Sequence, residues 1–180
     1  MVLALGLAGC SPDARTTTPT TPAPAPTTTS PTPTPTPTAD PNPAGLKPLP
    51  ADEIDASFVT IENFFRAYEY ALTSGDTAPL KSLSTKSCKF CSSAVDDIQE
   101  FYGAGGEMTG GSFLISVFKL LPSTRDNVDV WRLELRQADS SSLRSDGSTR
   151  TIPGFVGPVL VEVSTGPDVK ISEVDTELDK

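Results

Sequence analysis

Histidine is absent from this chain of 180 residues, and tryptophan occurs once. Without an imidazole, the protein has no histidine-based nucleophilic triad, no histidine metal ligand and no ordinary general base for neutral pH. Positive charge is also scarce, since 14 lysine and arginine residues face 23 aspartate and glutamate residues, a net charge of −9. So acidic a chain repels phosphate backbones, and we therefore expect no nucleic-acid partner.

Long apolar runs are absent as well, because no run approaches the roughly 18 residues of a membrane-spanning helix. The apolar run at residues 2–7 leads into Leu7-Ala8-Gly9-Cys10. This tetrapeptide resembles the lipobox of bacterial lipoprotein signal peptides, in which the chain is cut before the cysteine and the sulfur receives a diacylglycerol. The resemblance implies that residues 1–10 end a signal peptide. It also implies that lipid on Cys10 (palmitate among its acyl chains) holds the protein at the extracytoplasmic face of the cell membrane.

One feature of a signal peptide is missing, because no lysine or arginine precedes Cys10. A secretory signal normally begins with a positive segment, so we expect the true start to lie upstream of Met1. The alternative is a cytosolic protein in which Leu-Ala-Gly-Cys occurs by chance. The composition of the segment that follows favours the exported lipoprotein.

Residues 11–50 are expected to form a disordered linker. Their central part, 16–38, consists almost entirely of threonine, proline, alanine and serine, with alternating proline and threonine at 31–38. Such a composition cannot bury a core, and alternating proline favours the polyproline II conformation. We interpret the segment as a semi-rigid stalk, and both an O-glycosylated stalk and a plain linker fit its composition.

Residues 51–180 carry the periodic apolar positions of one globular domain. A long helix is predicted over 52–74, because apolar residues recur there at three- and four-residue steps. These apolar positions are Ile54, Phe58, Ile61, Phe64, Phe65, Tyr68 and Leu72. Gly75 is suited to end this helix, and a short second helix is expected after Asp76 or Thr77.

A third helix is expected to stop at the glycine-rich run 103–106, after which the apolar period changes to two. Residues 112–121 are apolar on both faces and predict a buried central strand. The alternation over 130–137 predicts a strand with one solvated face, and two more strands are expected around 159–163 and 169–171. This order predicts an α+β fold, with three N-terminal helices packed on a curved four-stranded antiparallel sheet.

Helices followed by a curved sheet resemble the cone of nuclear-transport-factor-2-like proteins. Residues 70–80 are similar to the junction of the first two helices in that fold, and residues 168–171 are similar to its closing strand. More narrowly, Ser87-Cys88-Lys89-Phe90-Cys91, which follows Gly75-Asp76 and Pro79-Leu80, resembles an actinobacterial lipoprotein family, domain of unknown function 6318. That resemblance implies a fold and a cellular address, and it carries no activity.

The cone of that fold often encloses a pocket between helices and sheet. Four aromatic residues are candidates to line it: Tyr68, Tyr102, Phe113 and Trp131. The alternative for aromatic residues at these spacings is an ordinary place in the core.

Some relatives of the fold are isomerases or hydrolases that use a buried carboxylate with a tyrosine. Here the acidic residues fall at solvent-like positions, except for Glu162 beside Leu160 on an apolar strand face. Two cysteines without a histidine cannot complete a zinc site. We therefore predict no catalytic residue, metal or cofactor.

Cys88 and Cys91 form an even pair once Cys10 carries lipid, and in an oxidising compartment such a pair predicts a disulfide. The same CxxC spacing is used in thioredoxin-like thiol–disulfide exchange. Ser87 and Ser92 stand where such redox proteins often carry tryptophan and proline. We therefore favour a structural disulfide that fixes the turn between the second and third helices.

Two classes of function fit these observations. The first is a non-catalytic binding or spacer module with a protein or glycan partner in the cell envelope. The second is a pocket protein that captures a small apolar molecule, and a CxxC thiol–disulfide protein is a weaker third alternative. A continuous apolar cavity favours the pocket protein, whereas a filled cone favours the surface module.

Overall fold

The first helix, α1 (Glu53–Ser74), begins and ends where its local sequence dictates. The Asp52 side chain caps it by accepting hydrogen bonds from the backbone N–H groups of Ile54 and Asp55, at 3.0 and 3.1 Å. Gly75 ends the helix in the left-handed conformation and bonds its N–H to the Ala71 carbonyl. Ile54, expected on the apolar face, is instead 52% exposed, because it lies in the first turn beyond the core.

Two shorter helices follow, α2 (Ala78–Ser82) and α3 (Lys89–Gly103). The Asp76 carboxylate accepts the backbone N–H of Ala78 at 2.9 Å, whereas Thr77, at the N-cap position of α2, makes no side-chain capping bond. Cys88 occupies the N-cap of α3, so the cysteine pair lies at the start of this helix. The computed structural model describes residues 40–176 of the chain.

The strands form two antiparallel sheets, where the sequence predicted one. The four-stranded sheet has the order β2 (Phe113–Leu121), β3 (Val128–Gln137), β6 (Val156–Ser164), β7 (Lys170–Thr176). The three-stranded sheet has the order β1 (Glu107–Gly110), β4 (Ser140–Leu143), β5 (Thr149–Ile152). The second sheet was missed because its strands are short, serine- and threonine-rich and mostly exposed, and therefore lack an apolar alternation.

The prediction that residues 112–121 form a buried central strand is wrong. β2 lies at one edge of the four-stranded sheet and pairs only with β3 among the described residues. Its Leu114 and Val117 are 61% and 44% exposed. Apolar residues on both faces are typical of a central strand, but here one of those faces meets solvent.

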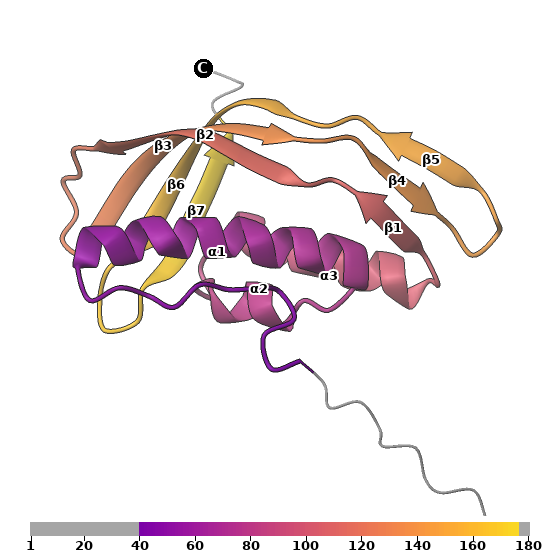
Figure 1. Ribbon diagram of the computed structural model, residues 1–180, viewed down its shortest axis with the longest axis horizontal. Coiled ribbons are helices and arrows are strands. Elements are labelled where there is room, and N and C mark those ends of the chain that lie inside the picture. The colour runs from indigo at the N-terminus through magenta and orange to yellow at the C-terminus, as the bar shows by residue number, and fades with distance from the viewer. Residues whose placement is uncertain (1–39, 177–180) are drawn as a thin grey trace, which may run out of the picture. The chain divides into compact units, whose positions relative to one another are not determined.

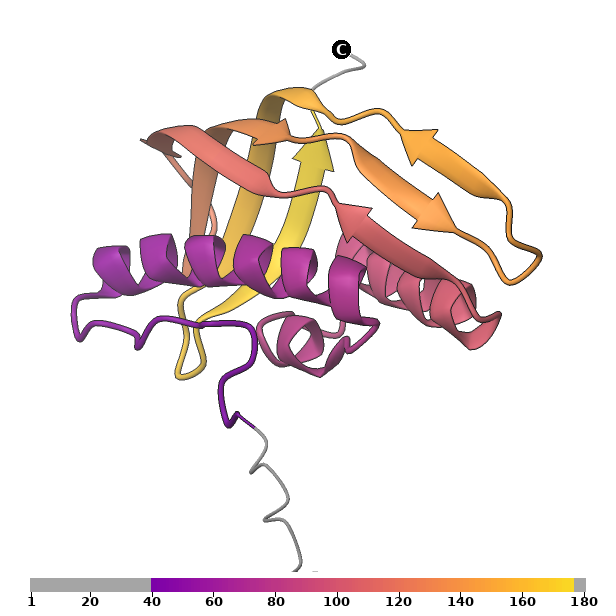
Figure 2. The ribbon, with the colours of Figure 1, turned by 45° about the vertical axis from the view of Figure 1, so that its right-hand side comes forward.

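The helices lie on one side of the four-stranded sheet, and the other side of that sheet is uncovered among the described residues (Figures 1 and 2). The space between the two layers is filled by side chains without solvent contact, including Ile61 and Phe64 of α1, Leu133 of β3, and Val161 of β6. The alternation predicted for 130–137 is confirmed, since Trp131, Leu133 and Leu135 all face this core.

The folded part of the chain begins upstream of residue 51, inside the linker expected over 11–50. Residues 40–50 run along α1 (Figure 1), and Leu46 packs against the core. The Asn63 amide, which is 2% exposed, binds both backbone groups of Lys47: it accepts the N–H at 2.7 Å and donates to the carbonyl at 2.8 Å. Composition did not reveal this segment because a backbone clamp leaves no apolar pattern.

Candidate functional site

Trp131, one of the four residues expected to line a pocket, is a core residue. Its side chain is 6% exposed, and its indole N–H donates to the Ser57 hydroxyl at 2.8 Å. Phe58 and Phe118 pack against it, with ring centroids 6.2 and 6.4 Å away. These contacts satisfy the polar atom of the indole and cover its faces, so Trp131 holds α1 against β3.

Tyr102 seals the end of α1. Its hydroxyl donates to the Leu72 carbonyl at 2.8 Å, and its ring lies directly over Gly75. A Cβ at Gly75 would sit 2.7 Å from that ring, so the close approach requires glycine. Burial raises the pKa of Tyr102, so the phenol remains a donor further into alkaline solution. Tyr102 therefore joins α3 to α1.

Tyr68 and Phe113 form the one pair among the four that the structure brings together. Their rings stack at a centroid distance of 5.2 Å. Burial raises the pKa of Tyr68, and the negative charge of Asp97 adds to the effect. Phe113, but not Tyr68, also lines a groove between α1 and β2.

This groove, which we call the edge groove, has a volume of about 250 Å³. Its apolar lining residues are Phe65, Phe113, Leu114, Ile115 and Phe118. Polar side chains of α1 form its rim: Glu62, Arg66 and Glu69. Because it runs beside the free edge of β2, an extended chain can reach both its apolar floor and the backbone of that strand. The edge groove is the candidate binding site.

Sequence reasoning named Phe113 but missed the edge groove. The signal was present in residues 112–121, whose two apolar faces were read as burial on both sides. An edge strand with apolar residues on its solvated face gives the same pattern. The exposed residues Leu114 and Val117 belong to this pattern, and solvent exposure alone distinguishes the two cases.

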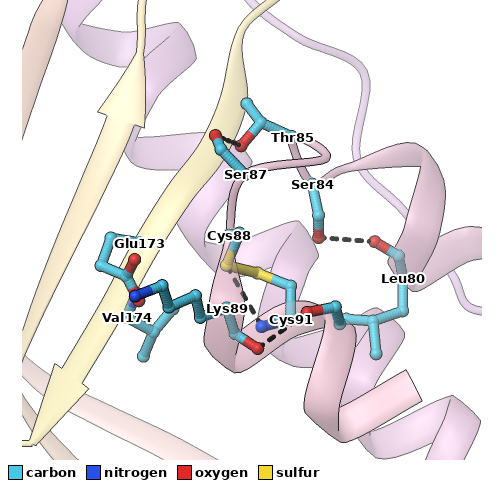
Figure 3. The surroundings of a disulfide bond; sticks show 10 residues. Leu80, Ser84, Thr85, Ser87, Cys88, Lys89, Cys91, Glu173 and Val174 are labelled. Carbon is cyan, nitrogen blue, oxygen red and sulfur yellow. Dashed lines mark hydrogen bonds between the residues drawn. A yellow bond between two sulfur atoms is a disulfide. The ribbon is translucent and has the colours of Figure 1, made fainter. Parts of the chain in front are cut away.

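Cys88 and Cys91 form a disulfide with Cα atoms 5.3 Å apart. The Sγ atom of Cys88 also accepts the backbone N–H of Cys91 at 3.2 Å, which caps α3 (Figure 3). Both residues are almost completely buried, with 1% and 2% exposure. Burial keeps the sulfur atoms from an attacking thiol, which favours the structural role over thiol–disulfide exchange.

Glu162, the acidic residue flagged on an apolar strand, lies on the outer face of the sheet and pairs with Arg125. Within residues 40–176, no group of three histidine, cysteine, aspartate or glutamate side chains is placed to hold a metal ion. No helix in this part of the chain is long and apolar enough to cross a membrane. Cys10 and the stalk at 16–38 lie outside the described residues.

The helices on one face of a curved antiparallel sheet define an α+β fold whose structural neighbours include nuclear-transport-factor-2-like proteins. The family model of DUF6318, a family of unknown function, matches residues 24–154, and the chain belongs to that family. The match begins within the threonine- and proline-rich segment and ends before β6. No curated protein matches the chain.

Three solved structures illustrate the likeness. The intermembrane space region of the chloroplast protein ARC6 is 12% identical and has a TM-score of 0.51, over 71% of this chain and 97% of that one. A protein from Catenulispora acidiphila in complex with S-DNPA is 12% identical over 67% and 91% of the chains, with a TM-score of 0.42. An NTF2-like protein of unknown function from Exiguobacterium sp. 255-15 is 13% identical over 65% and 95%, with a TM-score of 0.36. At 12% identity the likeness to the first of these structures shows the fold alone.

Proposed function

We propose that this protein is a membrane-anchored, non-catalytic binding module that engages a partner through its surface. The observation that carries the proposal is the filled interior between helices and sheet. Ile61, Phe64, Leu133 and Val161 have no solvent contact there. The polar atoms of Trp131 and Tyr102 bond within the domain. Because side chains fill the interior, we infer that a partner binds at the surface of the domain.

The anchoring part of the proposal rests on Leu7-Ala8-Gly9-Cys10 and on the threonine- and proline-rich segment that follows it. A diacylated cysteine gives stable attachment, whereas a single acyl chain would give only marginal attachment. At roughly 3.1 Å per residue in polyproline II, the segment 16–38 extends to about 70 Å. A spacer of that length lifts a binding domain away from a membrane surface.

Cell fractionation tests the anchor. The full-length chain is expected in the membrane fraction, and a Cys10→Ser variant is expected to leave it. A matched Cys88→Ser/Cys91→Ser variant keeps the anchor cysteine, so it is expected to stay with the membrane. If the Cys10→Ser variant fractionates as the wild type does, the anchoring proposal is wrong.

Site-specific photo-crosslinking in intact cells tests the surface module. A photoreactive side chain is placed at one exposed apolar position of each layer: Ile54 on α1, Leu114 on β2 and Leu143 on β4. We expect one position to give a discrete crosslinked species and the other two to give none. If no position yields a discrete species, or all three yield the same smear, the domain is not a binding module.

A further inference from the structure

The two edge strands of the four-stranded sheet, β7 and β2, differ in whether another segment of the chain pairs with them. At β7, Ile171 donates its N–H to the Leu83 carbonyl and accepts the N–H of Thr85, both at 2.8 Å. The chain between α2 and α3 therefore covers that edge as a short parallel bridge. At β2, no strand lies beyond the edge among the described residues (Figures 1 and 2). Unpaired ladder groups of this kind are ready to pair with another chain.

The hydrogen bonds of β3 show which groups of β2 point outward. The backbone N–H of Gln137 donates to the Phe155 carbonyl at 2.7 Å, and its carbonyl accepts the N–H of Phe155 at 3.2 Å. Both backbone groups of Gln137 therefore point toward the β6 side. Because backbone groups alternate between the two neighbouring strands, the N–H and C=O groups of Leu135, Leu133 and Trp131 also point toward β6. Their partners on β2 therefore direct their backbone N–H and C=O groups to the free edge. These partners are Phe113, Ile115, Phe118 and Leu120.

One of these outward backbone N–H groups, that of Phe113, already has an acceptor from outside the sheet. Its backbone N–H is bonded to the Glu69 carboxylate of α1 at 3.3 Å, in the place where a neighbouring strand would offer a carbonyl. An incoming strand that pairs at this position would replace the bond with one to its own carbonyl. Replacement would release a negative charge at the rim of the edge groove.

The side chains around this edge define the chemistry of the incoming strand. On its inner face, the strand would lie over the edge groove against Phe65, Phe113 and Phe118. On its outer face, it would lie beside Leu114 and Val117, two exposed apolar residues of β2. A strand with apolar side chains is therefore favoured by burial on both faces.

Charge complementarity identifies the partner further. The rim of the edge groove contains Arg66 as well as Glu62 and Glu69, and Glu62 is already paired with Lys47 at 2.7 Å. The preference for a cationic partner therefore rests on the Glu69 carboxylate and on the net charge of −9 of the whole chain. We propose that β2 and the edge groove bind an extended, apolar and cationic segment of a partner polypeptide, which adds to the sheet as a fifth strand. This inference rests on the proposed function as a surface-binding module and names its binding face.

A second copy of the chain fits this edge less well. The pairing of β2 with β3 shifts register between Ile115 and Val117, an irregularity that bends the strand at the middle of the edge. Such a bulge interrupts regular pairing with any added strand at this point, so it does not by itself distinguish a partner from a second copy. Association of two copies would, however, bring together chains that each carry a net charge of −9.

The test uses the full chain with Cys10→Ser, which removes the lipid and keeps everything else. The probe is a fluorescent decapeptide with valine at its central positions, so that both faces of the strand are apolar, and with threonine and lysine toward its ends. We expect saturable binding with a dissociation constant of about 1–100 μM, as for modest strand addition. The same peptide with glutamate for lysine, and the same peptide N-methylated throughout, are expected to show no saturable binding.

Two matched pairs of variants locate the site. Val117→Lys is expected to weaken binding at least about tenfold, whereas Leu143→Lys, at a similarly exposed apolar position on β4, leaves it unchanged. Glu69→Gln is expected to weaken binding of the lysine peptide several-fold, whereas Glu100→Gln on α3 does not. Glu69→Gln keeps an acceptor for Phe113, so a change in peptide affinity reports on charge.

Amide hydrogen exchange supplies a readout of strand pairing itself. With peptide bound, the N–H groups of Ile115 and Phe118 are expected to gain protection. Those of Leu114 and Lys119 are expected to change little, because they already face β3. Binding without this alternation, or binding retained by the N-methylated peptide, overturns strand addition.

Other outcomes identify other occupants and also overturn the proposal. A concentration-dependent dimer that Val117→Lys abolishes would mean that a second copy occupies the edge. Peptide binding that appears only after deletion of residues 16–38 would mean that the chain's own stalk occupies it. If the peptide fails to bind while photo-crosslinking still captures a partner through Ile54 or Leu143, the surface module stands and only this assignment of its face is wrong.

Discussion

The indole N–H of Trp131 on β3 donates to the hydroxyl of Ser57 on α1 at 2.8 Å, across the interface of helix and sheet. Both residues are buried, so Ser57→Ala would leave the indole N–H without a partner. We expect a loss of about 1–3 kcal/mol in the free energy of unfolding, measured in urea. In a Trp131→Phe background, the same Ser57→Ala change should cost much less. Equal costs in the two backgrounds would show that the two residues are not coupled.

The close approach of Tyr102 to Gly75 predicts that replacing Gly75 with alanine destabilises the domain more than the same change at Gly147. Gly75 and Gly147 both have positive φ, at 76° and 80°, but a Cβ at Gly147 meets no atom within 4 Å. Gly147→Ala should cost about 1–2 kcal/mol for the left-handed conformation. Gly75→Ala should cost about 1–3 kcal/mol more, because the methyl group collides with the Tyr102 ring. Thermal unfolding of both variants provides the comparison, and equal losses would contradict it.

The clamp between Asn63 and Lys47 predicts that the start of the folded domain affects its stability. A chain that begins at Asp40 and one that begins at Leu49 should both unfold cooperatively. The shorter chain should be less stable by about 1–3 kcal/mol, because the buried Asn63 amide loses both backbone partners. Asn63→Ala should therefore destabilise the longer chain more than the shorter one. If the variant costs the same in both chains, residues 40–48 contribute nothing through this clamp.

The disulfide between Cys88 and Cys91 should contribute modestly to stability. Closing so short a loop is worth about 2 kcal/mol on the chain-entropy estimate. The Cys88→Ser/Cys91→Ser variant should therefore lose several degrees in Tm and keep its circular dichroism spectrum. Because both sulfur atoms are buried, dithiothreitol should reduce the native protein slowly. Fast reduction together with catalysed refolding of a test disulfide would instead identify a redox protein.

The buried Tyr68 predicts a loss of stability in alkaline solution. Burial, together with Asp97, raises its pKa in the folded state above the unfolded value of about 10. The stability from the neutral phenol is therefore complete below pH 10 and is lost as the pH rises beyond it. Tyr68→Phe should flatten this decline in the free energy of unfolding, and a residual slope is expected from Tyr102. An unchanged slope in Tyr68→Phe would show that Tyr68 ionises as freely as in the unfolded chain.

Local sequence by itself determined the features whose cause is local. The helix over 52–74 could be predicted together with its end at Gly75, because helical periodicity and a C-terminal glycine act over a few residues. The structure adds that Asp52 is the N-cap and that the helix begins at Glu53. The alternation of Trp131, Leu133 and Leu135 specified the buried face of β3 in the same way. The family and its fold could also be recognised from short motifs of this kind.

Tertiary structure decided which neighbour each strand has and what each aromatic residue touches. The two apolar faces of β2 are compatible with a central or an edge strand, and only pairing across the sheet placed it at the edge. Likewise, Tyr68 and Phe113 meet while Trp131 and Tyr102 bond elsewhere, although all four lie at apolar positions of predicted helices or strands. Periodicity along a chain reports burial of a face, whereas partners distant in sequence are chosen by the packing of the whole domain.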